Sequence, residues 1–123
     1  MRIKNNIAKY NFYAYHYTVL WYNSDVAIKS FKDKTTEAAN YGQTTKQTQK
    51  LLPVELHQKA QIKLAVLGAA TSLNDLLELR GNRLEALKGD RSGAYSIRIN
   101  DQYRICFQWR ESDAYNVEII DYH

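Results

Sequence analysis

The segment 87–123 constrains the fold more than any other part of this chain, because its apolar residues alternate with polar ones around two turns. Apolar side chains recur at every second position before and after Asn100 and Asp101, which is the spacing of half-buried strands. A second turn at 111–113 leads into a third alternating run. We therefore predict three consecutive antiparallel strands. The alternating residues are Tyr95, Ile97, Ile99, Tyr103, Ile105, Phe107, Trp109, Tyr115, Val117 and Ile119.

The same alternation assigns the two faces of the predicted sheet. One face should be core, and the other should display polar or charged residues to solvent. The displayed residues would be Ser96, Arg98, Arg104, Cys106 and Gln108. Cys106 is the only cysteine, so the chain has no internal disulfide and a reducing cytoplasm is its expected location. A single cysteine inside a strand is most often a small buried hydrophobe.

Length and charge limit the class of protein. With 123 residues the chain supports one domain with one core, and 17 Lys and Arg against 13 Asp and Glu permit a polyanionic partner without requiring one. Residues 1–25 are interpreted as an extension before a domain at 26–123, either an appendage or a misplaced translation start, rather than an edge strand or partner contact. They contain no clean apolar run, so we predict neither a signal peptide nor a membrane span.

The residues between this extension and the sheet predict mainly helices. Apolar spacing at 26–31 indicates a short first strand, and 33–41 fits one short helix ended by Gly42. Residues 43–50 are rich in Thr and Gln and are interpreted as a loop. After the helical segments described in the next paragraph, the Gly81-Asn82 pair should reverse the chain into a strand at 83–87.

The strongest helix signal begins at Pro53 and ends before Gly68. Its apolar stripe should cover the sheet, and its polar side chains should face solvent. The stripe consists of Leu56, Ala60, Leu64 and Leu67, and the polar set of Glu55, Gln58, Lys59 and Lys63. Ser72, with Asp75 three residues later, predicts a cap on a further short helical turn.

The chain lacks a phosphate-binding glycine loop, zinc-ligand spacing and a nucleophile elbow, so we expect no metal and no cofactor. Basic and aromatic residues gather near the predicted sheet instead, namely Arg80, Arg83, Lys88, Arg91, Arg98, Arg104, Tyr122 and His123. Metal-free RNA cleavage needs a base for the ribose 2′-hydroxyl, cations for the phosphorane and an acid for the leaving oxygen. Such residues supply these roles, although charge distribution alone fits a solvated face equally well.

Several motifs together resemble the HigB-type toxins of the RelE/ParE superfamily. They are Leu87-Lys88-Gly89-Asp90-Arg91, Gly93, Tyr95-Ser96-Ile97, Tyr103-Arg104-Ile105, Phe107, Asp113-Ala114-Tyr115 and the terminal Asp121-Tyr122-His123. The resemblance covers 26–123. It implies a small α+β domain of RelE-like fold, with N-terminal helices packed on one face of a mainly antiparallel sheet. It further implies a toxin of a type II toxin-antitoxin system that cleaves mRNA on the translating ribosome and is silenced by a HigA-like, helix-turn-helix antitoxin.

The resemblance also implies roles for individual residues. Lys88 and Arg104 fall at the family's basic active-site positions, and Asp121, Tyr122 and His123 form its C-terminal catalytic cluster. The residues expected to bind RNA are Arg83, Arg91 and Arg98. Strict alternation would put Tyr122 on the opposite face from Asp121 and His123, so the cluster requires the strand to end or twist before Asp121.

Two positions depart from the family pattern. Glu85 stands where many relatives carry a histidine, so a proton-transfer role there would fall to a carboxylate. Gln102-Tyr103-Arg104 replaces a common Asn-Trp-Arg. The missing histidine keeps open a second function, a non-enzymatic growth inhibitor that binds DNA gyrase, as in the ParE branch. The terminal Asp-Tyr-His favours the ribonuclease.

Overall fold

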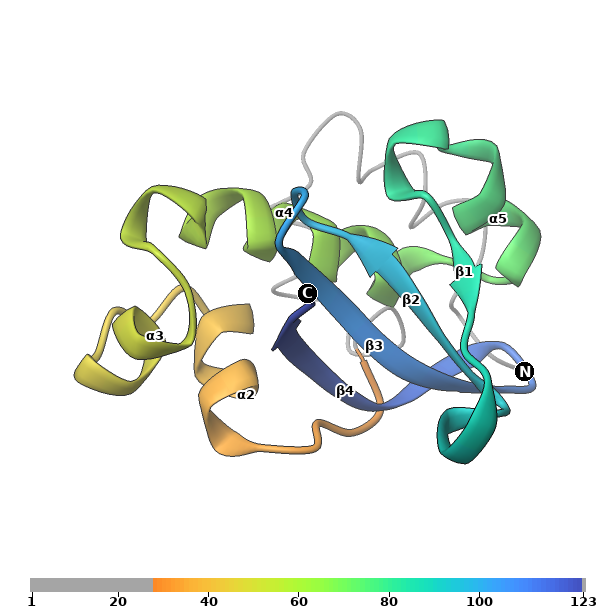
Figure 1. Cartoon of the computed structure of the whole chain (residues 1–123), viewed down its shortest axis with the longest axis horizontal. Coiled ribbons are helices and arrows are strands. Elements are labelled where there is room, and N and C mark those ends of the chain that lie inside the picture. The colour runs from red at the N-terminus through yellow and green to blue at the C-terminus, as the bar shows by residue number, and fades with distance from the viewer. Residues whose placement is uncertain (1–27, 123) are drawn as a thin grey trace.

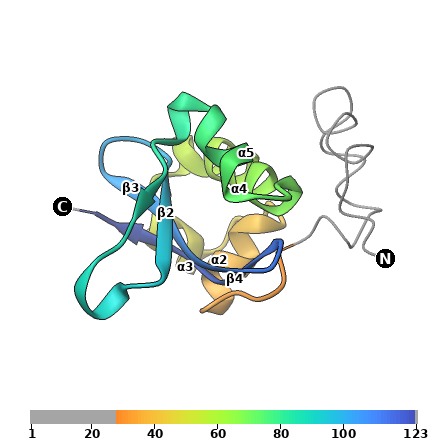
Figure 2. The same ribbon diagram turned by 90° about the vertical axis from the view of Figure 1, so that its right-hand side faces the viewer.

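The computed structural model describes residues 28–122, so the predictions for 1–25 and for His123 lie outside the described residues. Four antiparallel strands form one sheet in the order β1-β2-β3-β4, and helices α2 to α5 form a layer on one side of it (Figures 1 and 2). This two-layer α+β arrangement confirms the predicted fold class. Within the described range, no helix is long and apolar enough to cross a membrane.

The strands form where the alternating pattern predicts them. β2 (Ala94–Arg98), β3 (Tyr103–Arg110) and β4 (Asp113–Asp121) follow one another through two turns. The predicted hairpin is confirmed by the antiparallel pairing of β2 and β3, in which Ile97 lies opposite Ile105. Of the strand predicted at 83–87, only the part at β1 (Glu85–Ala86) forms. The strand does not begin at Arg83, because that residue has a left-handed backbone with φ of 44°.

The predicted strand at 26–31 does not form in its described part, from Ile28 onward. Residues 28–32 instead run beside β4 with a single parallel bridge between Phe31 and Val117. The Val117 amide donates to the Ser30 carbonyl, and the Lys32 amide donates to the Val117 carbonyl, at 3.1 and 2.9 Å. The segment is too short to add further rungs before Asp33 begins a helix.

The first helix confirms its prediction, and the next corrects one. Helix α2 (Lys34–Asn40) is capped by Asp33, and Gly42 follows it with φ of +74°. Residues 43–50, predicted as loop, contain helix α3 (Lys46–Leu51). The reason is local: Thr45 and Thr48 bond reciprocally to each other's backbone amides, so a threonine replaces the usual glutamate of a capping box.

The main helical region continues two residues beyond its predicted end. A short 3-10 turn, η2 (Val54–Leu56), precedes α4 (His57–Ala69), which passes through Gly68. Helix α5 (Leu73–Glu78) carries the predicted Ser72 cap, and η3 (Arg80–Asn82) then reverses the chain. Gly68 does not end the helix, and it is buried within α4.

The predicted stripe on α4 forms the core contact with the sheet. Ala60, Leu64 and Leu67 are fully buried in the same core as Ile97 and Ile105, and Leu56 packs against this core. Lys63 was expected in solvent but is half-buried, and its ammonium donates to Asn82 Oδ1 at 2.7 Å. Burial lowers the pKa of Lys63, and the nearby charges of Lys59 and Arg98 lower it further.

Candidate functional site

The face of the sheet opposite the helices, called here the open face, is defined by the strand register. Ser96 lies opposite Cys106, Cys106 opposite Glu118, and Arg104 opposite Ile120. Arg98 and Gln108 are accessible on this face as predicted, whereas Ser96 and Arg104 are at most 8% exposed, so their predicted display to solvent is wrong. Cys106 lies on the same face and is buried, as expected for a small hydrophobe within a strand. They are covered because long side chains lie across the strands, as the contacts of Arg104 illustrate.

Arg104 is a nearly buried cation fixed by three hydrogen bonds. Its Nε donates to Ser96 Oγ at 2.8 Å. Its Nη2 donates to the carbonyl oxygens of Arg83 and Ser96 at 2.6 and 3.3 Å. Its Nη1 has no hydrogen-bond partner among residues 28–122, and this nitrogen is not fully buried. The guanidinium is therefore held rigidly while one nitrogen remains able to bind an anion.

Tyr122 lies over Arg104 and is bonded to Glu85. The Arg104 Cζ atom is 5.5 Å from the centre of the Tyr122 ring, within cation–π range. The Tyr122 hydroxyl donates to Glu85 Oε1 at 3.1 Å. This bond, together with the negative charge of Glu85, raises the pKa of the Tyr122 phenol. Three residues from β1, β3 and the chain end thus form one contiguous group, and Tyr122 is held in its protonated form.

Asp121 lies apart from this group. It pairs with Tyr103 in the sheet, and its Oδ2 accepts a hydrogen bond from Gln102 Nε2 at 3.1 Å. β4 ends at Asp121, but the side chain of Tyr122 still follows the alternation of the strand and lies on the same face as Arg104. The structure therefore brings together Glu85, Arg104 and Tyr122 but does not place Asp121 with them. His123 lies beyond the described residues.

The remaining predicted cations surround the open face. Lys88 is exposed at the start of η4 (Gly89–Arg91), and its ammonium has no partner within the described range. Arg91 pairs with Glu118 Oε2 at 2.7 Å, and Arg98 pairs with the exposed Asp101. Arg83 contributes its carbonyl to Arg104, while its own side chain is exposed. Residues 28–122 hold no cluster of three His, Cys, Asp or Glu side chains suited to a metal ion.

Sequence reasoning missed three residues that shape this face. Ser96 supplies two acceptors to Arg104, Gln102 holds Asp121, and Glu118 binds two cations. The register of the predicted hairpin could have found Ser96, because it is the residue before Ile97 and lies diagonal to Arg104. Nothing in the sequence separates Glu118 from other strand carboxylates.

Comparison with known proteins gives consistent results. Residues 29–123 match the model of a family described as the RelE-like toxin of type II toxin-antitoxin system HigB. The chain is 40% identical over 86 residues to Toxin HigB-1 of Vibrio cholerae, covering 70% of this chain and 87% of that protein. It is 32% identical over 96 residues to Endoribonuclease HigB of Proteus vulgaris, covering 78% of this chain and 99% of that protein.

Proposed function

Because this chain belongs to the HigB-like toxin family of type II toxin-antitoxin systems, we propose that it is an endoribonuclease that cleaves mRNA on the translating ribosome. The observation that carries this proposal is the group of Glu85, Arg104 and Tyr122 on the open face. A rigid cation beside an exposed aromatic ring suits a phosphodiester whose neighbouring base stacks on that ring. Two relatives whose names describe a toxin and an endoribonuclease support it.

The proposed chemistry is attack by the ribose 2′-hydroxyl on the adjacent phosphate. The 2′-oxygen gives up its proton and bonds to phosphorus, the bond from phosphorus to the 5′-oxygen breaks, and that oxygen leaves as a protonated 5′-hydroxyl. Arg104 would bind the scissile phosphate through Nη1, and the exposed Lys88 would add a second positive charge, so that both stabilise the phosphorane. No step in this scheme calls on a metal ion or a cofactor. His123, which directly follows Tyr122 in the chain, is proposed to transfer a proton near neutral pH.

Tyr122 and Glu85 are proposed to act as a pair. Tyr122 would stack the nucleotide beside the scissile phosphate, and Glu85 would fix the phenol by accepting its hydrogen bond. This arrangement gives the carboxylate a positioning role in place of the family histidine. Its negative charge is tolerable beside RNA because Arg104 and Lys88 supply two positive charges in the same region. Asp121 is proposed to fix the chain end through Gln102.

Membership of a type II family implies an antitoxin partner. We propose that this antitoxin is HigA-like, with a helix-turn-helix fold, and that it covers the basic open face and so keeps the toxin off the ribosome. The protein would then bind the ribosome, mRNA and antitoxin in the cytoplasm. Arg83, Arg91 and Arg98 are proposed to contact the RNA backbone as it crosses the sheet.

The test is cleavage of a defined mRNA in a purified translation system, mapped by primer extension. The full chain should cut ribosome-bound mRNA, and Lys88→Ala should reduce the rate about 10²- to 10³-fold through lost charge stabilisation. Lys59→Ala is the matched control, because Lys59 is an exposed lysine on α4, on the helical side of the molecule. Absence of cutting, together with inhibition of DNA supercoiling by purified gyrase, would instead support the gyrase-binding alternative.

A further inference from the structure

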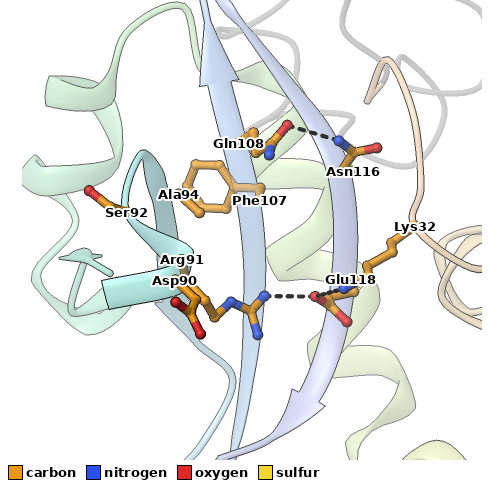
Figure 3. Close-up of a pocket in the computed structure, with 9 residues that line it drawn as sticks. All are labelled: Lys32, Asp90, Arg91, Ser92, Ala94, Phe107, Gln108, Asn116 and Glu118. Carbon is orange, nitrogen blue, oxygen red and sulfur yellow. Dashed lines mark hydrogen bonds and ion pairs between the residues drawn. The ribbon is translucent and has the colours of Figure 1, made fainter. Parts of the chain in front are cut away.

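The loop between β1 and β2 crosses the open face. Residues 88–93 form this loop, and its two ends meet where the Leu87 amide donates to the Ala94 carbonyl at 2.9 Å. Arg91 of the loop binds Glu118 Oε2 on β4 at 2.7 Å. Two strand spacings, about 10 Å, separate β2 from β4, so the Arg91 side chain reaches across β3 (Figure 3). The β1–β2 loop is therefore tied to a strand on the far side of the sheet.

The β1–β2 loop has little other support. A hollow of about 500 Å³ lies between it and strands β3 and β4. Gly89 and Gly93, near its two ends, have φ of +64° and +94°, a conformation that only glycine adopts freely. Apart from chain neighbours, no atom lies within 4 Å of the position that a Cβ would take on either glycine. Among residues 28–122, the contact of Arg91 with Glu118 is the only hydrogen bond or ion pair that joins the loop to the rest of the protein.

Glu118 is suited to hold the loop because it is itself fixed. It lies opposite Cys106 in the pairing of β3 and β4, and its side chain is only 15% exposed. Lys32, from the segment that runs beside β4, binds the same carboxylate oxygen at 3.2 Å. Partial burial reduces screening by solvent, so the pair of Glu118 and Arg91 is stronger than a fully exposed pair. Lys32 and Arg91 approach Glu118 from opposite sides, and Arg91 makes the closer contact.

The contact of Arg91 also determines the place of Lys88. The Arg91 amide donates to the Lys88 carbonyl at 3.3 Å, so the two residues belong to one turn of backbone. A movement of Arg91 would therefore move Lys88 with it. In the proposed reaction Lys88 has to meet the phosphate that Arg104 binds, and a misplacement of about 1 Å can cost about 10²-fold in rate.

We propose that Glu118 is a positioning residue for mRNA cleavage, because it binds Arg91 and so holds Lys88 in place over the open face. This inference rests on the proposed function. In the opposing view Glu118 only adds a negative charge beside the path of the RNA. The two views predict opposite signs. Removal of a negative charge near RNA should strengthen binding and should not slow cleavage, whereas removal of the group that holds the loop should slow cleavage.

The first experiment measures the loop without any cleavage. In the full chain, Glu118→Ala should lower the NMR order parameters of the backbone amides of residues 88–93, because the loop loses its contact with β4. Glu55→Ala is the matched control, because Glu55 is an exposed carboxylate on η2, and it should leave these values unchanged. Circular dichroism checks that both variants are folded. Unchanged order parameters at 88–93 in folded Glu118→Ala would overturn the proposal.

The second experiment measures cleavage of ribosome-bound mRNA. Glu118→Ala should lower kcat about tenfold or more, and KM should stay equal or fall. In a Lys88→Ala background the same change should have little further effect, because the loop then carries no lysine to position. A kcat at or above that of the unmodified chain, or an equal loss in both backgrounds, would overturn the inference alone. Absence of cutting by the unmodified chain would instead refute the proposed function.

Discussion

Replacing Arg104 with lysine should destabilise the fold although the charge is kept. The three hydrogen bonds of Arg104 diverge toward Ser96 Oγ and the carbonyls of Ser96 and Arg83. One ammonium group can reach only part of this set, so two acceptors would lose their charged donor. Hydrogen bonds to charged groups contribute roughly 1.5–3 kcal/mol each, and with partial replacement by water we expect a loss of about 2–4 kcal/mol.

Urea unfolding followed by circular dichroism measures this loss. With a slope of about 2 kcal/mol/M, the midpoint should fall by about 1–2 M. Arg98→Lys is the matched control, because Arg98 is the cross-strand partner of Arg104 but pairs only with the exposed Asp101. Exposed pairs contribute about 0–1 kcal/mol, so its midpoint should change little. Equal midpoints for the two variants would refute the view that Arg104 is a buried, structurally fixed cation.

Three further predictions follow from the site and the domain limits. Glu85→Ala removes the acceptor that raises the pKa of Tyr122, so the phenol should ionise at a lower pH than in the wild type. NMR titration of the Tyr122 ring carbons measures this pKa. An unchanged pKa would contradict the contact with Glu85. Glu85→His should increase the rate of mRNA cleavage if the family histidine is the better proton donor, whereas an unchanged rate would assign proton transfer to His123 alone. Expression of residues 26–123 should still arrest growth, and a harmless but soluble product would make residues 1–25 part of the functional unit.

The sheet and its two hairpins could be predicted because alternation and turns are local signals. Helix α3 could not, because its N-terminal cap uses Thr48 in place of the usual glutamate. The first strand was overestimated because its apolar residues pack against β4 through one bridge rather than a ladder. Local patterns therefore predict an element where its signal is strong, whereas the formation of weakly signalled elements and the bounds of all elements depend on the neighbours they meet in the fold.

The candidate site was less accessible to sequence reasoning. The burial of Arg104 could not be predicted, because it depends on contacts with Ser96 and Arg83, which lie 8 and 21 positions away in the sequence. The pairing of Glu85 with Tyr122 joins positions 37 residues apart and depends on where β4 ends. The register of β3 and β4 also shifts between Cys106 and Gln108, and no sequence signal for this β-bulge was recognised.

The open face is proposed to cleave RNA through the ribose 2′-hydroxyl, and the chemical groups at the fragment ends distinguish this mechanism from attack by water. Fragments from ribosome-bound mRNA, cut by the full chain, can be examined by mass spectrometry and by ligation that distinguishes terminal groups. The upstream fragment should end in a 2′,3′-cyclic phosphate or its hydrolysis product, and the downstream fragment should begin with a 5′-hydroxyl. A 5′-phosphate on the downstream fragment would contradict this mechanism, because it requires water rather than the 2′-hydroxyl to attack the phosphate.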